Sequence, residues 1–202
     1  TGPLTGLTVA VKDVFEVDGF AMGAGNPVWL AERAAASADS AAVAALRAAG
    51  AAVAGIAHTD EFAYSIAGRN AHWGTPPNGA APDRIPGGSS SGPASAVAAG
   101  QADIGLGTDT AGSVRVPASY QGLWGLRSTH GSTDAAGLLP LAPRFDAIGW
   151  MARDAVTLRA AVVAGLGGFE GAFRLAALAQ RPDPNRPLSE RSESKGTFVI
   201  AP

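Results

Sequence analysis

Three short stretches of the sequence carry residue types that could do chemistry together. Residues 86–92 read PGGSSSG and place three consecutive serines beside glycines. Residues 107–119 read GTDTAGSVRVPAS, and Lys12 directly follows the apolar run LTVAV. A serine hydroxyl becomes a useful nucleophile when a neighbouring base removes its proton. The plain alternative for the serine cluster is a loop, because Gly, Pro and Ser tolerate turn geometry.

Ser113 is the candidate nucleophile with the most suitable surroundings. We expect a strand to end near Gly107 and a helix to begin near Ser113. Successive backbone N–H groups at such a turn can point at one spot and stabilise an oxyanion. The alternative is that Ser113 only caps the helix, which is a common role for serine.

The candidate base is Lys12 rather than a histidine. His58, His72 and His130 stand in no recognisable triad context, and the GxSxG elbow of serine hydrolases is absent around Ser113. A lysine can lose its proton near neutral pH when burial disfavours the charged form. Lys12 follows a predicted buried strand, with a solvated lysine at the strand end as the alternative.

Together these motifs resemble the amidase signature family, whose members carry a Lys–Ser–Ser arrangement. Lys12, Ser89 and Ser113 occur in that order and at approximately the family's spacing. The sequence is especially similar to plant-type indole-3-acetamide hydrolases and their bacterial relatives, and the resemblance covers residues 4–165. Further similar segments are GNPVW (25–29), TDEFAYS (59–65), NAHWGTPPN (70–78) and FDAIGWMARD (145–154).

The resemblance implies a role for each residue of the triad. Ser113 would attack the amide carbonyl, Ser89 would relay the proton, and a neutral Lys12 would be the final base. It also implies a cis peptide bond between Gly88 and Ser89, which is an uncommon geometry outside proline. Gly87 would let this loop bend without a Cβ clash.

The family pattern further implies an oxyanion hole and its supports. The hole would use the backbone N–H groups of Thr110, Ala111, Gly112 and Ser113. Ala111 stands where Gly is commoner, as it also tends to in the family's allophanate hydrolases. As supporting residues we expect an Asp109–Arg115 ion pair, in preference to substrate binding by Arg115, and loop hydrogen bonds from Ser90 and Ser91.

The elements expected from the sequence give an α/β fold. We expect a mixed, mostly parallel central sheet covered by helices, because strands and helices alternate along the chain. Residues 68–92 are dense in Gly, Pro and Asn and predict a long loop. Expected strands are residues 7–11, 51–57 and 104–107, and expected helices are residues 36–49, 94–99, 113–120 (kinked or stopped near Pro117) and 154–165.

The resemblance implies one domain, of which this chain holds a part. Family members are about twice as long, so residues 1–170 are predicted to be the N-terminal portion of a single amidase-signature domain. Residues 180–202 look atypical: the polar, Pro-rich stretch 180–196 is expected to be a linker or disordered, and the strand-like TFVIAP follows it.

The implied function is hydrolysis of a carboxylic amide to the acid and ammonia through an acyl-enzyme. Two alternatives stay within the family: a truncated inactive or partner-dependent fragment, and the amidase subunit of a tRNA-dependent amidotransferase. A phosphate-binding loop at PGGSSSG is disfavoured, because the GK[ST] ending of a P-loop is missing.

Composition narrows the expected partners. The net charge of -2 gives no basic footprint for nucleic acid, and no apolar run has the length of a membrane helix. The absence of cysteine excludes disulfides and thiolate metal sites, and fits the cytoplasm. We therefore expect a cytoplasmic enzyme with a small-molecule amide substrate, without cofactor or metal, and leave a homodimer open.

Overall fold

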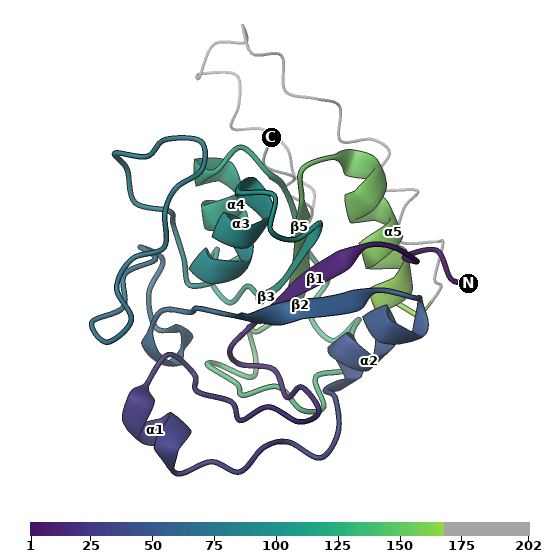
Figure 1. Cartoon of the computed structure of the whole chain (residues 1–202), viewed down its shortest axis with the longest axis horizontal. Helices are drawn as coiled ribbons and strands as arrows, with labels where there is room; N and C mark the ends of the chain where they lie inside the picture. The colour runs from purple at the N-terminus through teal and green to yellow at the C-terminus, as the bar shows by residue number, and fades with distance from the viewer. Residues whose placement is uncertain (168–202) are drawn as a thin grey trace, which may run out of the picture.

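A single five-stranded sheet forms the centre of the computed structural model, which describes residues 1–167 (Figure 1). The strand order is β2-β1-β3-β5-β4. β1 runs parallel to β2 and β3, whereas β5 runs antiparallel to β3 and β4, so the expected mixed sheet is confirmed with equal numbers of parallel and antiparallel pairs. The strands are Thr8–Lys12 (β1), Ala52–Ala57 (β2), Ile104–Thr108 (β3), Trp124–Arg127 (β4) and Ile148–Ala152 (β5).

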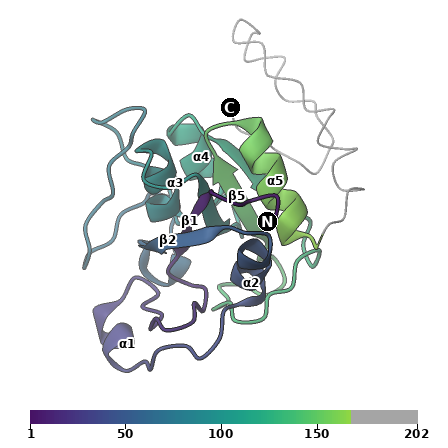
Figure 2. The ribbon, with the colours of Figure 1, turned by 45° about the vertical axis from the view of Figure 1, so that its right-hand side comes forward.

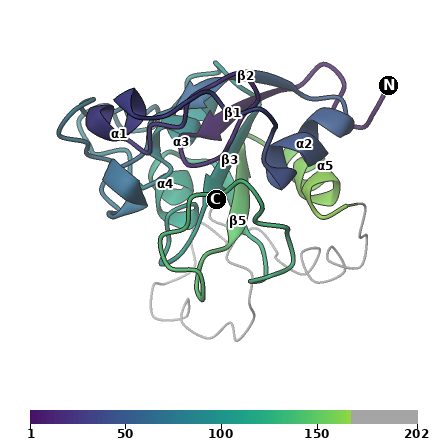
Figure 3. The ribbon, with the colours of Figure 1, turned by 90° about the horizontal axis from the view of Figure 1, so that it is seen from below.

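Helices cover both faces of the sheet (Figure 3). α3 and α4 lie on one face and α2 and α5 on the other, and Figure 2 shows β5 with α4 on one side and α5 on the other. The described helices are Pro27–Ala31 (α1), Ala41–Ala48 (α2), Ser91–Ala98 (α3), Arg115–Tyr120 (α4) and Ala155–Gly165 (α5), with a 3-10 turn at Glu61–Ala63.

The alternation of side chains along β1 decides where the candidate base points. Successive side chains of a strand face opposite sides of the sheet. Val9 and Val11 pack into the apolar core beneath α2 and α5, and Ala10 packs into the second core beneath α3 and α4. Lys12 therefore projects from the same face as Ala10, towards the helices that follow the two serine motifs.

Three expected elements have different bounds in the structure. α2 begins at Ala41 after Ser40, and α3 already begins at Ser91, so the third serine of the cluster is helical. α4 begins at Arg115, which puts Pro117 in its first turn. Proline is tolerated there because first-turn N–H groups have no partner within the helix, so the predicted kink is wrong.

Other predictions are confirmed or fall outside the described residues. The expected strands at 51–57 and 104–107 match β2 and β3, and Asp154 caps α5 by accepting from the N–H groups of Val156 and Thr157. The linker and terminal strand expected within 180–202 lie outside residues 1–167. Among residues 1–167, none of the helices has the length and hydropathy of a membrane-spanning segment.

Candidate active site

Lys12 is the last residue of β1 and is completely buried. Its Nζ donates to Ser89 Oγ at 2.8 Å and to Thr108 Oγ1 at 2.7 Å. The alternative of a solvated strand-end lysine is therefore wrong. A neutral amine keeps one lone pair, so it can accept a proton from Ser89 while still donating to Thr108.

Burial lowers the pKa of Lys12 from 10.5 to about 7. The cause is desolvation, which disfavours the ammonium form in the interior. The negative charges of Asp60, Asp109 and Asp146 act in the opposite direction and raise this pKa. The amine and ammonium forms are therefore both accessible near neutral pH, as a general base requires.

Close packing fixes the loop that carries Ser89. The Gly88–Ser89 peptide is cis, and Ser89 is fully buried. A Cβ on Gly88 would lie 2.6 Å from the backbone nitrogen of Gly68, so only glycine fits there. Gly87 has φ of +72°, a region that favours glycine.

Ser90 joins this loop to the segment that carries Ser113. Its N–H donates to the Ser113 carbonyl at 3.1 Å, and its Oγ donates to the Thr108 carbonyl at 3.3 Å. The two serine motifs, although separate in sequence, therefore lie side by side at the carboxyl end of β3. Ser91 belongs to α3 and is buried.

Ser113 is only 4% exposed and lies in the turn between β3 and α4. The N-cap of α4 is Val114, without a side-chain cap hydrogen bond, so the capping alternative for Ser113 is wrong. Within residues 1–167 the Ser113 hydroxyl has no hydrogen-bond partner. Its position is compatible with a nucleophile that is free to approach a substrate carbonyl.

Three of the four predicted oxyanion donors have free N–H groups. Within the described part of the chain, no acceptor is bonded to the N–H of Thr110, Ala111 or Ser113. The N–H of Gly112 instead donates to Asp109 Oδ1 at 2.8 Å. The turn therefore offers three donors, and the fourth already has an intramolecular partner.

Asp109 organises this turn through its buried carboxylate. It accepts from the N–H groups of Gly112, Val114 and Arg115, and from the Arg115 guanidinium in a bidentate pair at 2.9 Å. Burial alone would raise the pKa of Asp109, but the hydrogen bonds and charge of Arg115 outweigh it and lower this pKa. Arg127 also donates to the Asp109 carbonyl. Arg115 therefore supports this turn through its ion pair with Asp109, as expected from the sequence.

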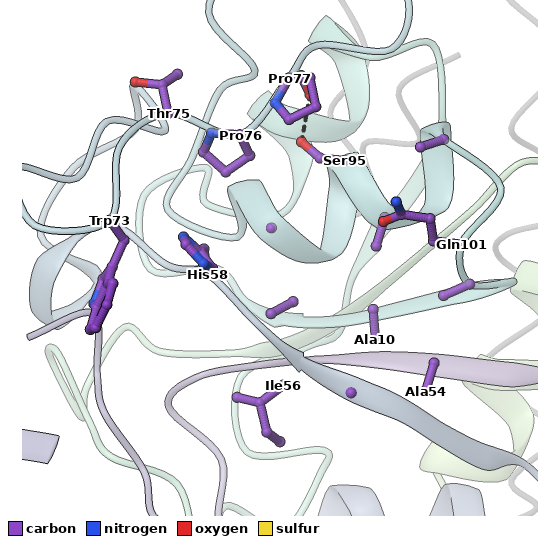
Figure 4. A pocket seen from close by; sticks show the side chains of 16 residues that line it. Ala10, Ala54, Ile56, His58, Trp73, Thr75, Pro76, Pro77, Ser95 and Gln101 are labelled. Carbon is purple, nitrogen blue, oxygen red and sulfur yellow. Dashed lines mark hydrogen bonds between the residues drawn. The ribbon is translucent and has the colours of Figure 1, made fainter. Parts of the chain in front are cut away.

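Within the described residues, none of the three histidines forms a hydrogen bond with Lys12, Ser89 or Ser113. His72 Nε2 lies 3.0 Å from Glu61, and His130 Nδ1 lies 2.8 Å from the Asp146 carbonyl. His58 lines a groove of about 440 Å³ between β2 and α3, beside Trp73 (Figure 4). Neither Lys12 nor the candidate serines line this groove.

Thr108, which accepts a hydrogen bond from Lys12, is a site residue that the sequence analysis missed. Thr108 ends β3 and Lys12 ends β1, and these strands are parallel neighbours. The carboxyl ends of parallel neighbours meet at one edge of a sheet. If the expected strand 104–107 is extended by one residue, this rule places Thr108 beside Lys12.

Comparison with known proteins agrees with this geometry. Residues 1–195 match the sequence profile of the Amidase family. The chain is 55% identical to Amidase 1 of Arabidopsis thaliana over 156 aligned residues. The aligned region covers 77% of this chain and 37% of that protein. It is 49% identical to the chloroplastic Outer envelope protein 64 of Arabidopsis thaliana, covering 78% of this chain and 27% of that protein.

Solved structures of an amidase and of an allophanate hydrolase are also similar to this chain. The native peptide amidase from Stenotrophomonas maltophilia matches with a TM-score of 0.75 and 34% identity, over 89% of this chain and 37% of that one. The Kluyveromyces lactis allophanate hydrolase matches with a TM-score of 0.75 and 35% identity, over 81% of this chain and 26% of that one. This chain therefore spans between about a quarter and a little over a third of the length of these relatives. It belongs to the Amidase family.

Proposed function

We propose that this chain carries the catalytic centre for hydrolysis of a carboxylic acid amide to the acid and ammonia. The observation that carries the proposal is the fully buried Lys12, with a pKa of about 7 and a hydrogen bond to Ser89. A base of this kind is what a serine nucleophile lacks when no histidine is near.

In the proposed reaction, Ser113 Oγ attacks the amide carbon while its proton passes to Ser89, whose own proton passes to Lys12. The N–H groups of Thr110, Ala111 and Ser113 stabilise the oxyanion. Collapse of this intermediate breaks the C–N bond, and the relay returns a proton to the leaving amine. Water then repeats the sequence on the acyl-enzyme, releasing the acid and restoring the Ser113 hydroxyl.

Covalent labelling tests this proposal. A fluorophosphonate should modify Ser113, because the reagent reacts with serines that a neighbouring base activates. Mass spectrometry of the digested chain would locate the adduct, and Lys12→Met should suppress it. Labelling that is absent, or spread over exposed serines and unchanged in Lys12→Met, would contradict the proposal.

A second candidate is a fragment that is inactive or depends on a partner. The short span relative to the relatives favours it, because the remaining length could supply walls of the acyl pocket. Turnover of amides by the 202-residue chain alone, together with cooperative melting, would exclude this candidate. The cytoplasmic location remains a prediction, since one relative is an outer envelope protein of chloroplasts.

A further inference from the structure

Asp60 is a buried carboxylate that the proposed mechanism does not use. It follows β2 and is only 1% exposed. Its Oδ2 accepts from the N–H of Gly68 at 3.0 Å. Its Oδ1 has no hydrogen-bond partner within residues 1–167. A buried carboxylate with an unpaired oxygen is costly unless a positive charge compensates it.

Asp60 packs against the peptide that presents Ser89 to the lysine. Its backbone N–H donates to the Ser89 carbonyl at 3.3 Å. Its Oδ2 and Oδ1 lie 2.7 Å and 2.9 Å from the place where a Gly88 Cβ would be. The carboxylate therefore lies directly behind the cis peptide whose serine bonds Lys12.

The other carboxylates around Lys12 have partners of their own. Asp109 holds Arg115 and several N–H groups, and lies near Arg127. Asp146 accepts from the Thr110 hydroxyl and from the N–H groups of the 141–142 turn. Among the charges that act on Lys12, that of Asp60 has the largest effect.

Of the cationic side chains near Asp60, Lys12 is the best candidate for its counter-ion. Arg69 borders the same depression as Asp60, together with Glu61, but Arg69 is exposed to solvent. His58, two residues earlier, faces the groove beside Trp73. Among the described residues, Lys12 is the cationic side chain that is completely buried.

We propose that Asp60 is the buried counter-charge of Lys12, and that it stabilises the ammonium formed when Ser89 delivers its proton. Asp60 is therefore a positioning residue, which acts on the reaction through Lys12. The role of Asp60 in catalysis rests on the proposed amidase function. The electrostatic interaction between Asp60 and Lys12 is independent of that function. Without this carboxylate the amine would be a weaker base and would hold its proton only at lower pH.

A lysine titration by NMR tests the coupling without any assay of activity. The chain contains two lysines, Lys12 and Lys195, so ¹³Cε-labelled lysine gives two resonances, which Lys12→Met assigns. In Asp60→Asn, which conserves shape and removes charge, the midpoint of Lys12 should fall by about one pH unit or more. An unchanged midpoint would overturn the proposal.

Asp13→Asn is the matched control. Asp13 is next to Lys12 in sequence, but its oxygens accept from the N–H groups of Gly23 and Gly25. Its charge is not among those that raise the pKa of Lys12. This variant should leave the Lys12 midpoint nearly unchanged, and an equal fall in both variants would count against a specific role for Asp60.

The wild-type chain supplies a second measurement if Asp60→Asn fails to fold. The ¹³Cγ resonance of Asp60 should show a step at the pH where Lys12 titrates, and its absence would overturn the proposal. Failure of the amidase function is distinguishable: Ser113 would then resist fluorophosphonate while the coupling could still be measured. A reactive Ser113 with an unshifted Lys12 in Asp60→Asn would reject the counter-charge alone.

Discussion

Replacing Ser113 by alanine is expected to lower the turnover of an amide substrate by roughly 10⁴- to 10⁶-fold. The variant keeps the backbone N–H groups of the turn and removes only the oxygen that forms the acyl-enzyme. Residual hydrolysis would come from direct attack of water on the bound amide, with the oxyanion stabilised by the backbone N–H groups of the turn. Steady-state release of ammonia, measured with wild type and variant at the same enzyme concentration, checks this.

Two comparisons make the Ser113 result interpretable. Ser37→Ala, at an exposed position between α1 and α2, should retain wild-type turnover. The melting temperature of Ser113→Ala should stay near that of the wild type, because the Ser113 side chain makes no hydrogen bond within the described residues. A Ser113→Ala variant that retains most of its activity would eliminate Ser113 as the nucleophile.

Replacing Asp109 by alanine is expected to lower the free energy of unfolding by about 3 to 5 kcal/mol. The carboxylate is fully buried, and its removal leaves the half-buried guanidinium of Arg115 without its partner. The N–H groups of Gly112 and Val114 lose their acceptor as well. Urea denaturation followed by circular dichroism gives this difference directly.

A partly exposed ion pair provides the control for Asp109. Arg47 lies 3.1 Å from Asp39, and the side chains are 41% and 14% exposed, respectively. Asp39→Asn should cost at most about 1 kcal/mol, because water and salt screen such pairs. If Asp109→Ala costs no more than Asp39→Asn, the carboxylate does not hold the turn together as we describe.

The sequence points to the candidate triad residues more directly than it points to the strands of the sheet. Residue type, order and flanking glycines point to Lys12, Ser89 and Ser113, because this chemistry tolerates few substitutes. β4 and β5 escape prediction, since WGLR and IGWMA are too short to show a strand period. Both antiparallel pairs of the sheet, β3 with β5 and β5 with β4, include these unpredicted strands.

The surroundings of the candidate triad residues depend on contacts between distant segments. Asp60 meets Gly88 only after the loop that follows β2 folds over the loop that precedes α3. The bond from Gly112 to Asp109 likewise depends on the backbone conformation of the turn, with φ of +127° at Gly112. Such effects of tertiary structure on local groups cannot be obtained from residue spacing alone.

The protonation of Lys12 is the central claim, and it can be measured in the unmodified chain. In ¹³Cε-labelled lysine spectra, the resonance that Lys12→Met removes should titrate with a midpoint near pH 7. A deprotonated fraction at neutral pH is what allows Ser89 to pass its proton on. A midpoint near the ordinary lysine value of about 10.4 would show that Lys12 stays charged, and would contradict its assignment as the base.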